Sequence, residues 1–385
     1  MTFSSLFPYL FVGLLIALAI GAGIMLLLGS KNASGAGWAV TILFFGVGAL
    51  AVVALVLGFD GGGSLLSGQS AWVEPGGNLR TLSLGLHDEP MSWIWILASA
   101  LVGLAFLASR DLHSGGRAPH RLYAALAVEM AACGLCWVSY SAWSALFACG
   151  LALAGGVILL GTHSGVSGEE ARFAFRYALE RFGALVMALL GVLTLAWHGV
   201  DLVPGAPAPS VGTGFPGGWI LAVGAYLMVR PFPLLGWAES PSQVSPAGRI
   251  LVAELLPGIA AYGLIHEAAP TLKQLGVFPL FGVVPLAGMA LTMLAGLFQQ
   301  DPSRALSCWL SAAFCAGLSA LAWAGPTVSD PLLLGTLLGC AGFIVAVGSL
   351  ERGSGGWASP TGMVAMAGAA SATGMFGFLA AGGHF

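Results

Sequence analysis

Residues 224–247 of this chain read GAYLMVRPFPLLGWAESPSQVSPA, an apolar helical run interrupted by a charge and two prolines. Pro231 and Pro233 have no backbone N–H, and a proline inside a helix breaks or kinks it. Arg230 stands directly before them, where its guanidinium can satisfy carbonyl groups that the break leaves without partners. The stretch therefore predicts a broken helix over Gly218–Leu235.

Long apolar runs recur along the rest of the 385 residues. Apolar residues make up 58% of the chain and charged residues only 8%, against about 25% charged residues in soluble domains. A helix needs about 20 apolar residues to cross a bilayer. We therefore expect an all-α, polytopic integral membrane protein of about twelve transmembrane helices. They are expected over Ser5–Leu28, Gly37–Gly58, Met91–Ser109, Leu122–Tyr140, Trp143–Thr162, Phe182–Gly199, Gly218–Leu235, Pro246–Ala268, Val277–Phe298, Ala305–Gly325, Pro331–Leu350 and Pro360–Ala380.

The basic residues are distributed unevenly over the connections between these helices. Connections after even-numbered helices hold only Arg80 and Lys273, whereas those after odd-numbered helices hold nine basic residues. Because cytoplasmic loops carry an excess of Lys and Arg, the second side is expected to be cytoplasmic, with both termini outside. We expect the chain in a bacterial inner membrane. The nine residues are Lys31, Arg110, Arg117, Arg121, Arg172, Arg176, Arg181, Arg304 and Arg352.

The sequence contains few signs of chemistry. Six cysteines all fall inside predicted helices, and Cys133 and Cys136 form a C-x-x-C pair. With no second pair and no histidine at metal-ligand spacing, we interpret these thiols as small packing residues. No phosphate-binding glycine loop, nucleophile elbow or zinc motif is present. We therefore expect no catalytic site, cofactor or metal in this chain, and no nucleic-acid partner.

A few ionisable residues remain inside the predicted helices. An ionised side chain at mid-bilayer costs roughly 2.5–3.5 kcal/mol, so such residues normally face protein, water or a partner. Glu129 in the fourth helix and Glu254 in the eighth are candidates for an ion path or an intersubunit ion pair. Arg230 and Arg249, near cytoplasmic helix ends, are candidates for ion handling or for structural capping. Arg249 is also placed to meet Glu239 at the cytoplasmic mouth.

Two further polar segments lie at the helix ends. His266 and Glu267, next to Pro270, are expected at the outer membrane interface. On the cytoplasmic side, Glu169–Arg181 carries acids and bases at helical spacing. We expect this segment to form a short helical lead into the sixth helix, either as a solvated face or as a contact to a neighbour. The outer connection Asp60–Pro90 is expected to be too short for a separate domain.

Four landmarks, in a fixed order along the chain, carry a resemblance to a known family. They are Met228–Ala247, Leu179–Gly183, Gln299–Leu306, and Ser359–Thr361 followed by Gly374–Phe378. The first resembles a lysine-Ser-Ala-Gln-Phe-Pro break that leads to Pro-Thr-Pro-Val-Ser-Ala, and the second resembles Asn-Arg-x-Gly-Asp. The third resembles Gln-x-Asp-Ile-Lys-Arg-x-Leu. The fourth resembles Met-Pro-x-Thr followed later by Gly-x-Pro-x-x-Gly-Phe. These are motifs of the antiporter-like subunits of respiratory complex I, Mrp antiporters and membrane-bound hydrogenases, and the resemblance covers essentially the whole chain.

The departures from this family concern the residues that conduct protons. The family uses a glutamate in helix five, a lysine opening the helix-seven break, a histidine in helix eight and a lysine late in helix twelve. Here these positions hold Gly150 or a neighbour, Met228, Arg249, and Ala380 or Ala381. Arginine stays charged and cannot cycle a proton as lysine or histidine can. The resemblance therefore implies a degenerate member in which a complete proton relay is hard to build.

The resemblance implies one membrane domain built from two inverted repeats. Residues 1–120 would be N-terminal helices, 121–268 the first repeat and 277–385 a truncated second repeat. The expected function is that of a membrane subunit in a multi-subunit proton- or sodium-coupled complex, non-conducting or partly conducting, which scaffolds a partner. Its partners would be other membrane and peripheral subunits and the lipid bilayer, and any oxidoreductase activity would belong to a partner.

Two alternative functions stay open. One is the membrane subunit of a DAB-type, energy-coupled inorganic-carbon transporter, which serves a zinc-dependent hydrating subunit. The other is an autonomous secondary transporter that uses Glu129 and Glu254, which requires a complete, water-connected path of acids.

Overall fold

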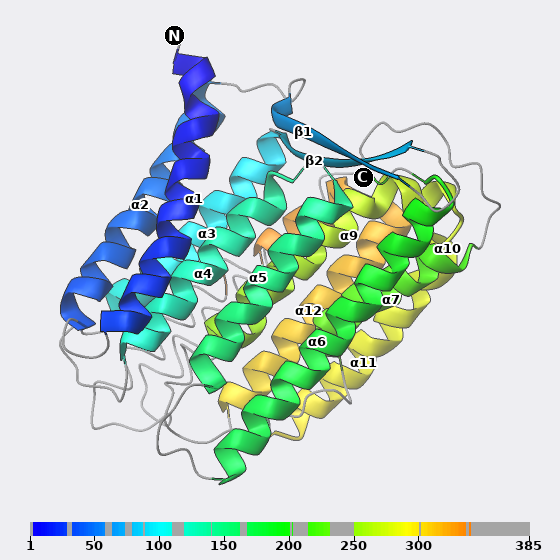
Figure 1. Ribbon diagram of the computed structural model, residues 1–385. Coiled ribbons are helices and arrows are strands. Elements are labelled where there is room, and N and C mark those ends of the chain that lie inside the picture. Colours follow the sequence, from blue (N-terminus) through cyan, green and yellow to red (C-terminus); the bar gives the residue numbers. More distant parts are fainter. Residues whose placement is uncertain are drawn as a thin grey trace.

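The computed structural model of the chain is a bundle of long helices that run side by side, with a β hairpin at one end (Figure 1). The structure describes residues 3–28, 33–57, 64–73, 79–87, 89–109, 119–139, 141–161, 168–200, 202, 215–231, 250–299, 302–335 and 339. The elements are α1 (Phe3–Leu28), α2 (Ala33–Leu57), β1 (Ser64–Val73), β2 (Leu79–His87), α3 (Pro90–Ser109), α4 (Pro119–Trp137), α5 (Ala142–Gly161), α6 (Gly168–Trp197), α7 (Pro216–Met228), η3 (Leu251–Leu255), α9 (Leu256–Gln274), α10 (Phe278–Phe281), α11 (Val283–Leu297) and α12 (Pro302–Ala324).

The described helices support the membrane class. Eight helical stretches among the described residues are long and apolar enough to cross a membrane. α6 begins at Gly168, so the predicted helical lead Glu169–Arg181 is continuous with the sixth helix. Residues 326–335 are helical as well, which starts the eleventh helix earlier than predicted. The predicted helix Pro360–Ala380 lies outside the described residues, so the count of about twelve stays a prediction.

Two elements lie in the interior of the bundle and are shielded from lipid. In the span Leu251–Gln274, which joins η3 and α9, 94% of the most apolar window is buried, whereas the corresponding share in α1 is 28%. α9 packs against α4, α5, α7 and α12. α4 is also almost entirely buried from Leu122 to Trp137. Because ionised groups are costly in lipid, these inner helices are where polar side chains can be accommodated.

A β hairpin lies between α2 and α3, and the all-α prediction did not include it. β1 and β2 pair antiparallel, with Gln69 opposite Ser83 and Ala71 opposite Thr81. The sequence holds a signal that would have found it. Leu82, Leu84 and Leu86 alternate with small or polar residues, and a Pro-Gly-Gly-Asn stretch precedes them. An apolar run of helical length does not capture this alternation, because its apolar residues recur only at every second position.

α6 and α7 approach so closely that their backbones meet at glycines. A Cβ added to Gly191 would lie 2.3 Å from the backbone nitrogen of Leu221, and one added to Gly224 would lie 2.4 Å from the backbone nitrogen of Ala188. Small residues allow such close helix packing in a membrane, where lipid supplies no hydrophobic drive between helices. This packing holds the end of α7 beside the middle of α6.

Replacing Gly191 by alanine is expected to destabilise the folded chain, because the new methyl group meets backbone atoms that cannot rotate away. We expect a cost of about 1–3 kcal/mol, typical of overpacking. Gly183→Ala, in the same helix, is the matched control, since a Cβ there meets nothing within 4 Å. Thermal unfolding of the two variants in detergent checks this, and equal midpoints would contradict the close packing of α6 and α7.

The orientation in the membrane is predicted from the basic residues and is tested by labelling. Cysteines introduced at Ser114 and Gly168 are expected to react with an impermeant maleimide only from the cytoplasm, and cysteines at Gly62 and Gly212 only from outside. The described native cysteines are buried and give a low background. Reversed labelling at either pair of positions would show that the orientation or the helix count is wrong.

Candidate functional site

α7 ends inside the bundle rather than at a membrane face. Its 13 residues span about 20 Å, less than the roughly 30 Å hydrocarbon core. Two residues after its end, Arg230 has a φ of 55°, and Pro231 follows. A left-handed residue after the last helical turn is a common stop signal, normally glycine, because a side chain there costs roughly 1–2 kcal/mol. The helix thus ends where the sequence predicts a break, and contacts of the Arg230 side chain must compensate the strain.

The neighbouring element is widened beside this end. Leu251–Leu255 form the π turn η3, which continues into α9. Pro257 has no N–H, so the carbonyl of Ala253, four residues earlier, loses its regular helical partner. Glu254 lies within this turn and is only 7% exposed. π turns are frequent at functional sites, and here the turn places Glu254 and the carbonyl of Ala253 next to the end of α7.

Four charged side chains join α6, the end of α7 and η3, and we call them the four-charge cluster: Glu180, Arg181, Arg230 and Glu254. Arg230 donates from Nη1 to Glu254 Oε1 at 2.7 Å and from Nη2 to Glu180 Oε2 at 3.1 Å. Arg181 donates from Nη2 to Glu254 Oε2 at 3.3 Å. Glu254 therefore accepts from both guanidinium groups, one on each oxygen. The two positive and two negative charges cancel, which reduces the cost of burying them.

Arg181 also binds backbone at both helix interruptions. Its Nη1 donates to the carbonyl of Met228, the last residue of α7, and its Nη2 donates to the carbonyl of Ala253 at 2.5 Å. Tyr177 Oη donates to the same Ala253 carbonyl at 3.3 Å. We expected Arg230 to satisfy the carbonyls freed by the break. Among the described residues, Arg181 of α6 binds the carbonyls of Met228 and Ala253, and Ser311 of α12 donates to those of Val229 and Arg230 at 3.1 Å, so the role predicted for Arg230 stays a prediction.

The ring of Tyr177 contributes a second contact to the cluster. The guanidinium carbons of Arg181 and Arg230 lie 5.5 and 5.3 Å from its centroid, within reach of cation–π attraction. Towards the end where α6 begins, Glu180 also accepts from Arg176 Nε at 2.9 Å, and Arg176 is 57% exposed. A series of ion pairs thus runs from the buried Glu254 through Arg230 and Glu180 to Arg176 at the surface.

Glu129 of α4 lies next to the cluster without joining it. It is fully buried, and no described side chain donates a hydrogen bond to either carboxyl oxygen. Gly155 of α5 provides the space for Glu129, and Gly156 provides the space for Tyr177. A Cβ on Gly155 would lie 2.7 Å from Glu129 Oε1, and one on Gly156 would lie 2.2 Å from Tyr177 Oη. An isolated ionised carboxylate is costly to bury, so Glu129 is the acid of this region whose burial the described contacts explain least.

A second polar group lies near the hairpin-side end of α9. Tyr262 Oη donates to Asp330 Oδ1 at 2.5 Å and lies 2.7 Å from Ser329 Oγ. His266 Nε2 is 3.4 Å from Asp330 Oδ2, close enough for an ion pair when the ring is protonated. Tyr262 lies eight residues after Glu254, about 12 Å along the helix. Because the residues between them are apolar, this group is separate from the four-charge cluster.

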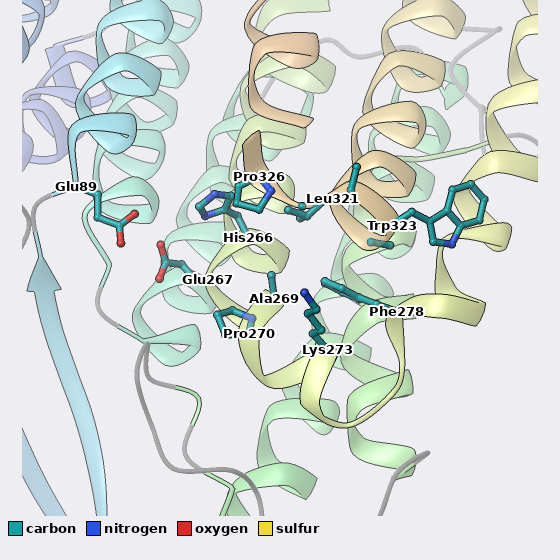
Figure 2. Close-up of a pocket in the computed structure, with 13 residues that line it drawn as sticks. Glu89, His266, Glu267, Ala269, Pro270, Lys273, Phe278, Leu321, Trp323 and Pro326 are labelled. Atoms are coloured by element: carbon teal, nitrogen blue, oxygen red, sulfur yellow. The ribbon is translucent and has the colours of Figure 1, made fainter. Parts of the chain in front are cut away.

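A pocket of about 460 Å³ opens beside this second group. Figure 2 shows Glu89 and Glu267 on one side of His266 and the side chain of Lys273 on the other side. His266 and Glu267 were predicted to be interfacial. The structure leaves the side chain of His266 14% exposed and that of Glu267 7% exposed.

The predicted site residues are only partly within the described chain. Glu129, Arg230 and Glu254 come together around the α7 end and the π turn. Arg249, Glu239 and Pro233 lie outside the described residues, and so does the predicted contact between the first two.

Sequence reasoning missed three of the residues that the structure brings into these groups. Glu180 and Arg181 were assigned to a cytoplasmic lead that is either solvated or in contact with a neighbour, yet Arg181 is 4% exposed inside the span Ala174–Trp197. Removing Arg181 from the nine basic residues of that side leaves eight against two, which still favours the same orientation. The landmark Leu179–Gly183 was the available signal. Asp330 was placed in a connection before Pro331, and no pattern marks it.

The cysteines of α4 and α5 make packing contacts. Cys133 donates to the Leu256 carbonyl at 3.4 Å, and Cys136 and Cys149 donate to the Ala260 carbonyl at 3.2 and 3.3 Å. These contacts agree with the interpretation of the thiols as packing residues. Among the described residues, no group of three His, Cys, Asp or Glu side chains is arranged to hold a metal ion.

Comparison with solved structures shows which fold this is. The chain is similar to a chain of the Mrp complex from Dietzia sp. DQ12-45-1b, with 13% identity, a TM-score of 0.66, and coverage of 98% of this chain but 45% of that one. It is similar to a chain of the membrane-bound sulfane sulfur reductase, an archaeal respiratory membrane complex, with 14% identity, 97% and 81% coverage and a TM-score of 0.71. It is also similar to a chain of respiratory complex I from Thermus thermophilus, with 16% identity, coverage of 96% of this chain and 86% of that one, and a TM-score of 0.64.

The predicted resemblance is therefore confirmed at the level of the fold, which this chain shares with chains of these three membrane complexes. The chain spans less than half of the Mrp-complex chain that it matches. No family model and no curated protein matches the sequence.

Proposed function

We propose that this chain is a membrane subunit of a multi-subunit, proton- or sodium-coupled complex related to complex I and Mrp antiporters. In that complex it conducts little or no ion current itself and scaffolds a partner. The fold shared with chains of three such membrane complexes supports the class. The observation that carries the limited conduction is the four-charge cluster, in which Glu254 accepts from two guanidinium groups.

The cluster stands where a conducting subunit needs a titratable side chain. At the α7 end the chain has Met228, whose carbonyl is bound by Arg181. A guanidinium stays charged, so neither arginine can take up and release a proton. Protonation of Glu254 would leave the buried guanidinium groups of Arg181 and Arg230 with Glu180 as the only carboxylate of the cluster. This cost opposes a role for Glu254 in proton transfer. We infer that the cluster fixes α6, α7 and η3 to one another.

The same geometry weighs against an autonomous transporter that uses Glu129 and Glu254. Such a transporter needs both acids to titrate, and only Glu129 lies without a guanidinium partner in the described chain. A subunit of an inorganic-carbon transporter and a subunit of a redox-driven complex would differ in the partner protein that they bind rather than in the four-charge cluster. We favour the respiratory or antiporter setting, because the three similar chains come from such complexes.

The proposal includes the finer organisation that the sequence predicts. It consists of about twelve helices with inverted repeats over 121–268 and 277–385, in a bacterial inner membrane with both termini outside. Partners are then expected to cover apolar helix surfaces that lipid would otherwise contact.

Identification of the proteins that co-purify with the tagged chain in mild detergent tests this function. We expect other antiporter-like membrane subunits together with a redox or cation-antiport subunit. A zinc protein resembling a β-carbonic anhydrase in their place would move the chain to the inorganic-carbon class. A stable, active monomer would contradict the subunit proposal.

A further inference from the structure

The pocket beside His266 lies where two candidate membrane spans end, which is where lipid headgroups are expected. The apolar spans of α9 and α12 end at Gln274 and Ala324, and the pocket is lined by the last turns of both helices. Trp323 in its wall is 52% exposed, and its Nε1 donates to the carbonyl of Pro279 at 3.1 Å. Tryptophan with an apolar ring and a satisfied N–H is typical of the membrane–water interface. A ligand at this depth can enter from the leaflet as well as from water.

The charges that line the pocket are separated by sign. Glu89 and Glu267 supply carboxylates on one side of His266, and Lys273 supplies an ammonium group on the other (Figure 2). Phe278 and Trp323 form an apolar wall, and Leu280 of the adjoining α10 is 66% exposed. A zwitterion with an apolar tail matches this pattern, with its positive end at the carboxylates and its negative end at the lysine.

We propose that this pocket binds the headgroup of a phospholipid that carries a primary ammonium group, of the phosphatidylethanolamine class. The ammonium donates to Glu89 and Glu267, the phosphate meets Lys273, and the acyl chains lie along Phe278 and Trp323. A choline headgroup has no N–H to donate and is expected to bind less well. The volume of about 460 Å³ lies within the roughly 300–1,000 Å³ range of small-molecule sites.

Retention of lipid by the purified protein tests the proposal. The full chain, with any subunits that accompany it, is placed in nanodiscs of equal phosphatidylethanolamine and phosphatidylcholine with the same acyl chains. It is then released in detergent, and the bound lipids are counted by native mass spectrometry. We expect ethanolamine lipid to be retained over choline lipid by about tenfold, the factor of roughly one charge-assisted hydrogen bond.

Variants at the pocket decide which groups recognise the lipid. Glu89→Gln with Glu267→Gln is expected to abolish the preference while keeping side-chain size, and Lys273→Gln is expected to weaken retention of both lipids. Gln274→Ala is the matched control, because Gln274 is the exposed neighbour of Lys273 and does not line the pocket.

Equal retention of the two lipids by the unaltered protein would overturn the proposal, and so would an unchanged preference in the Glu89→Gln, Glu267→Gln variant. Retention that depends on Lys273 alone would also overturn it, since it would show recognition of phosphate only. Lys273 is exposed, so its variant reports on binding rather than folding. No transport is measured, and the result is therefore independent of the ion-coupled function.

Discussion

Arg230→Ala is expected to lower the free energy of unfolding by about 3–5 kcal/mol, the usual cost of removing one partner from a buried ion pair. The Arg230 side chain is 1% exposed and donates to both Glu254 and Glu180. Its loss leaves these carboxylates inside the bundle with Arg181 as the remaining positive charge of the cluster. Equilibrium unfolding in detergent, followed by tryptophan fluorescence, measures the change.

Two further substitutions make this result specific. Arg176→Ala removes an arginine that binds the same Glu180 but is 57% exposed, so we expect a change within about 0.5 kcal/mol. Arg230→Gly removes the side chain but suits the backbone φ of 55°, so it is expected to cost about 1 kcal/mol less than alanine. Similar losses of unfolding free energy in Arg230→Ala and Arg176→Ala would contradict a stabilising role for Arg230 as a buried partner of two carboxylates.

Glu254→Gln is expected to be at least as damaging, because Glu254 is the one acid in the four-charge cluster that accepts from both guanidinium groups. We expect a loss of about 3–5 kcal/mol and a low yield of folded chain. Glu180→Gln is expected to cost less, since Glu180 is 15% exposed and one of its two arginine partners is solvated. Size-exclusion profiles of the variants, together with their unfolding curves, check this order.

The double variant Arg230→Gln, Glu254→Gln tests whether the two residues act together. It removes one charge of each sign, so its cost is expected to be about 1–3 kcal/mol smaller than the sum of the single variants. Additive costs, or a Glu254→Gln chain as stable as the wild type, would show that the cluster does not hold α6, α7 and η3 together.

The membrane helices could be predicted from sequence because lipid imposes a simple requirement. A spanning segment must be apolar for about 20 residues, and α1, α2, α3 and α5 all lie within a few residues of their predicted bounds. The end of α7 was also predictable, since Pro231 has no backbone N–H and disfavours a helical conformation of the residue before it. Both features are local, so neither depends on knowing which helices are neighbours.

The composition of the site depends on neighbours and could not be predicted in the same way. Arg181 lies next to an apolar run, and the sequence alone does not tell how deep in the membrane such a residue sits. Its partners, Met228, Ala253 and Glu254, come from two other elements that are 47 to 73 residues away. Glu129 and Glu254 were recognised because each is an acid within an apolar helix, where it needs a reason to be present.

The central claim is that this subunit carries no complete proton path of its own, and Glu129→Gln tests it most directly. Glutamine keeps the size of the side chain against Gly155 but cannot carry a proton. The measurement is coupled transport by the reconstituted complex, divided by the number of assembled particles. The account predicts transport per particle close to that of the wild type. Abolished transport in a fully assembled Glu129→Gln complex would contradict it and would show that a working channel passes through this chain.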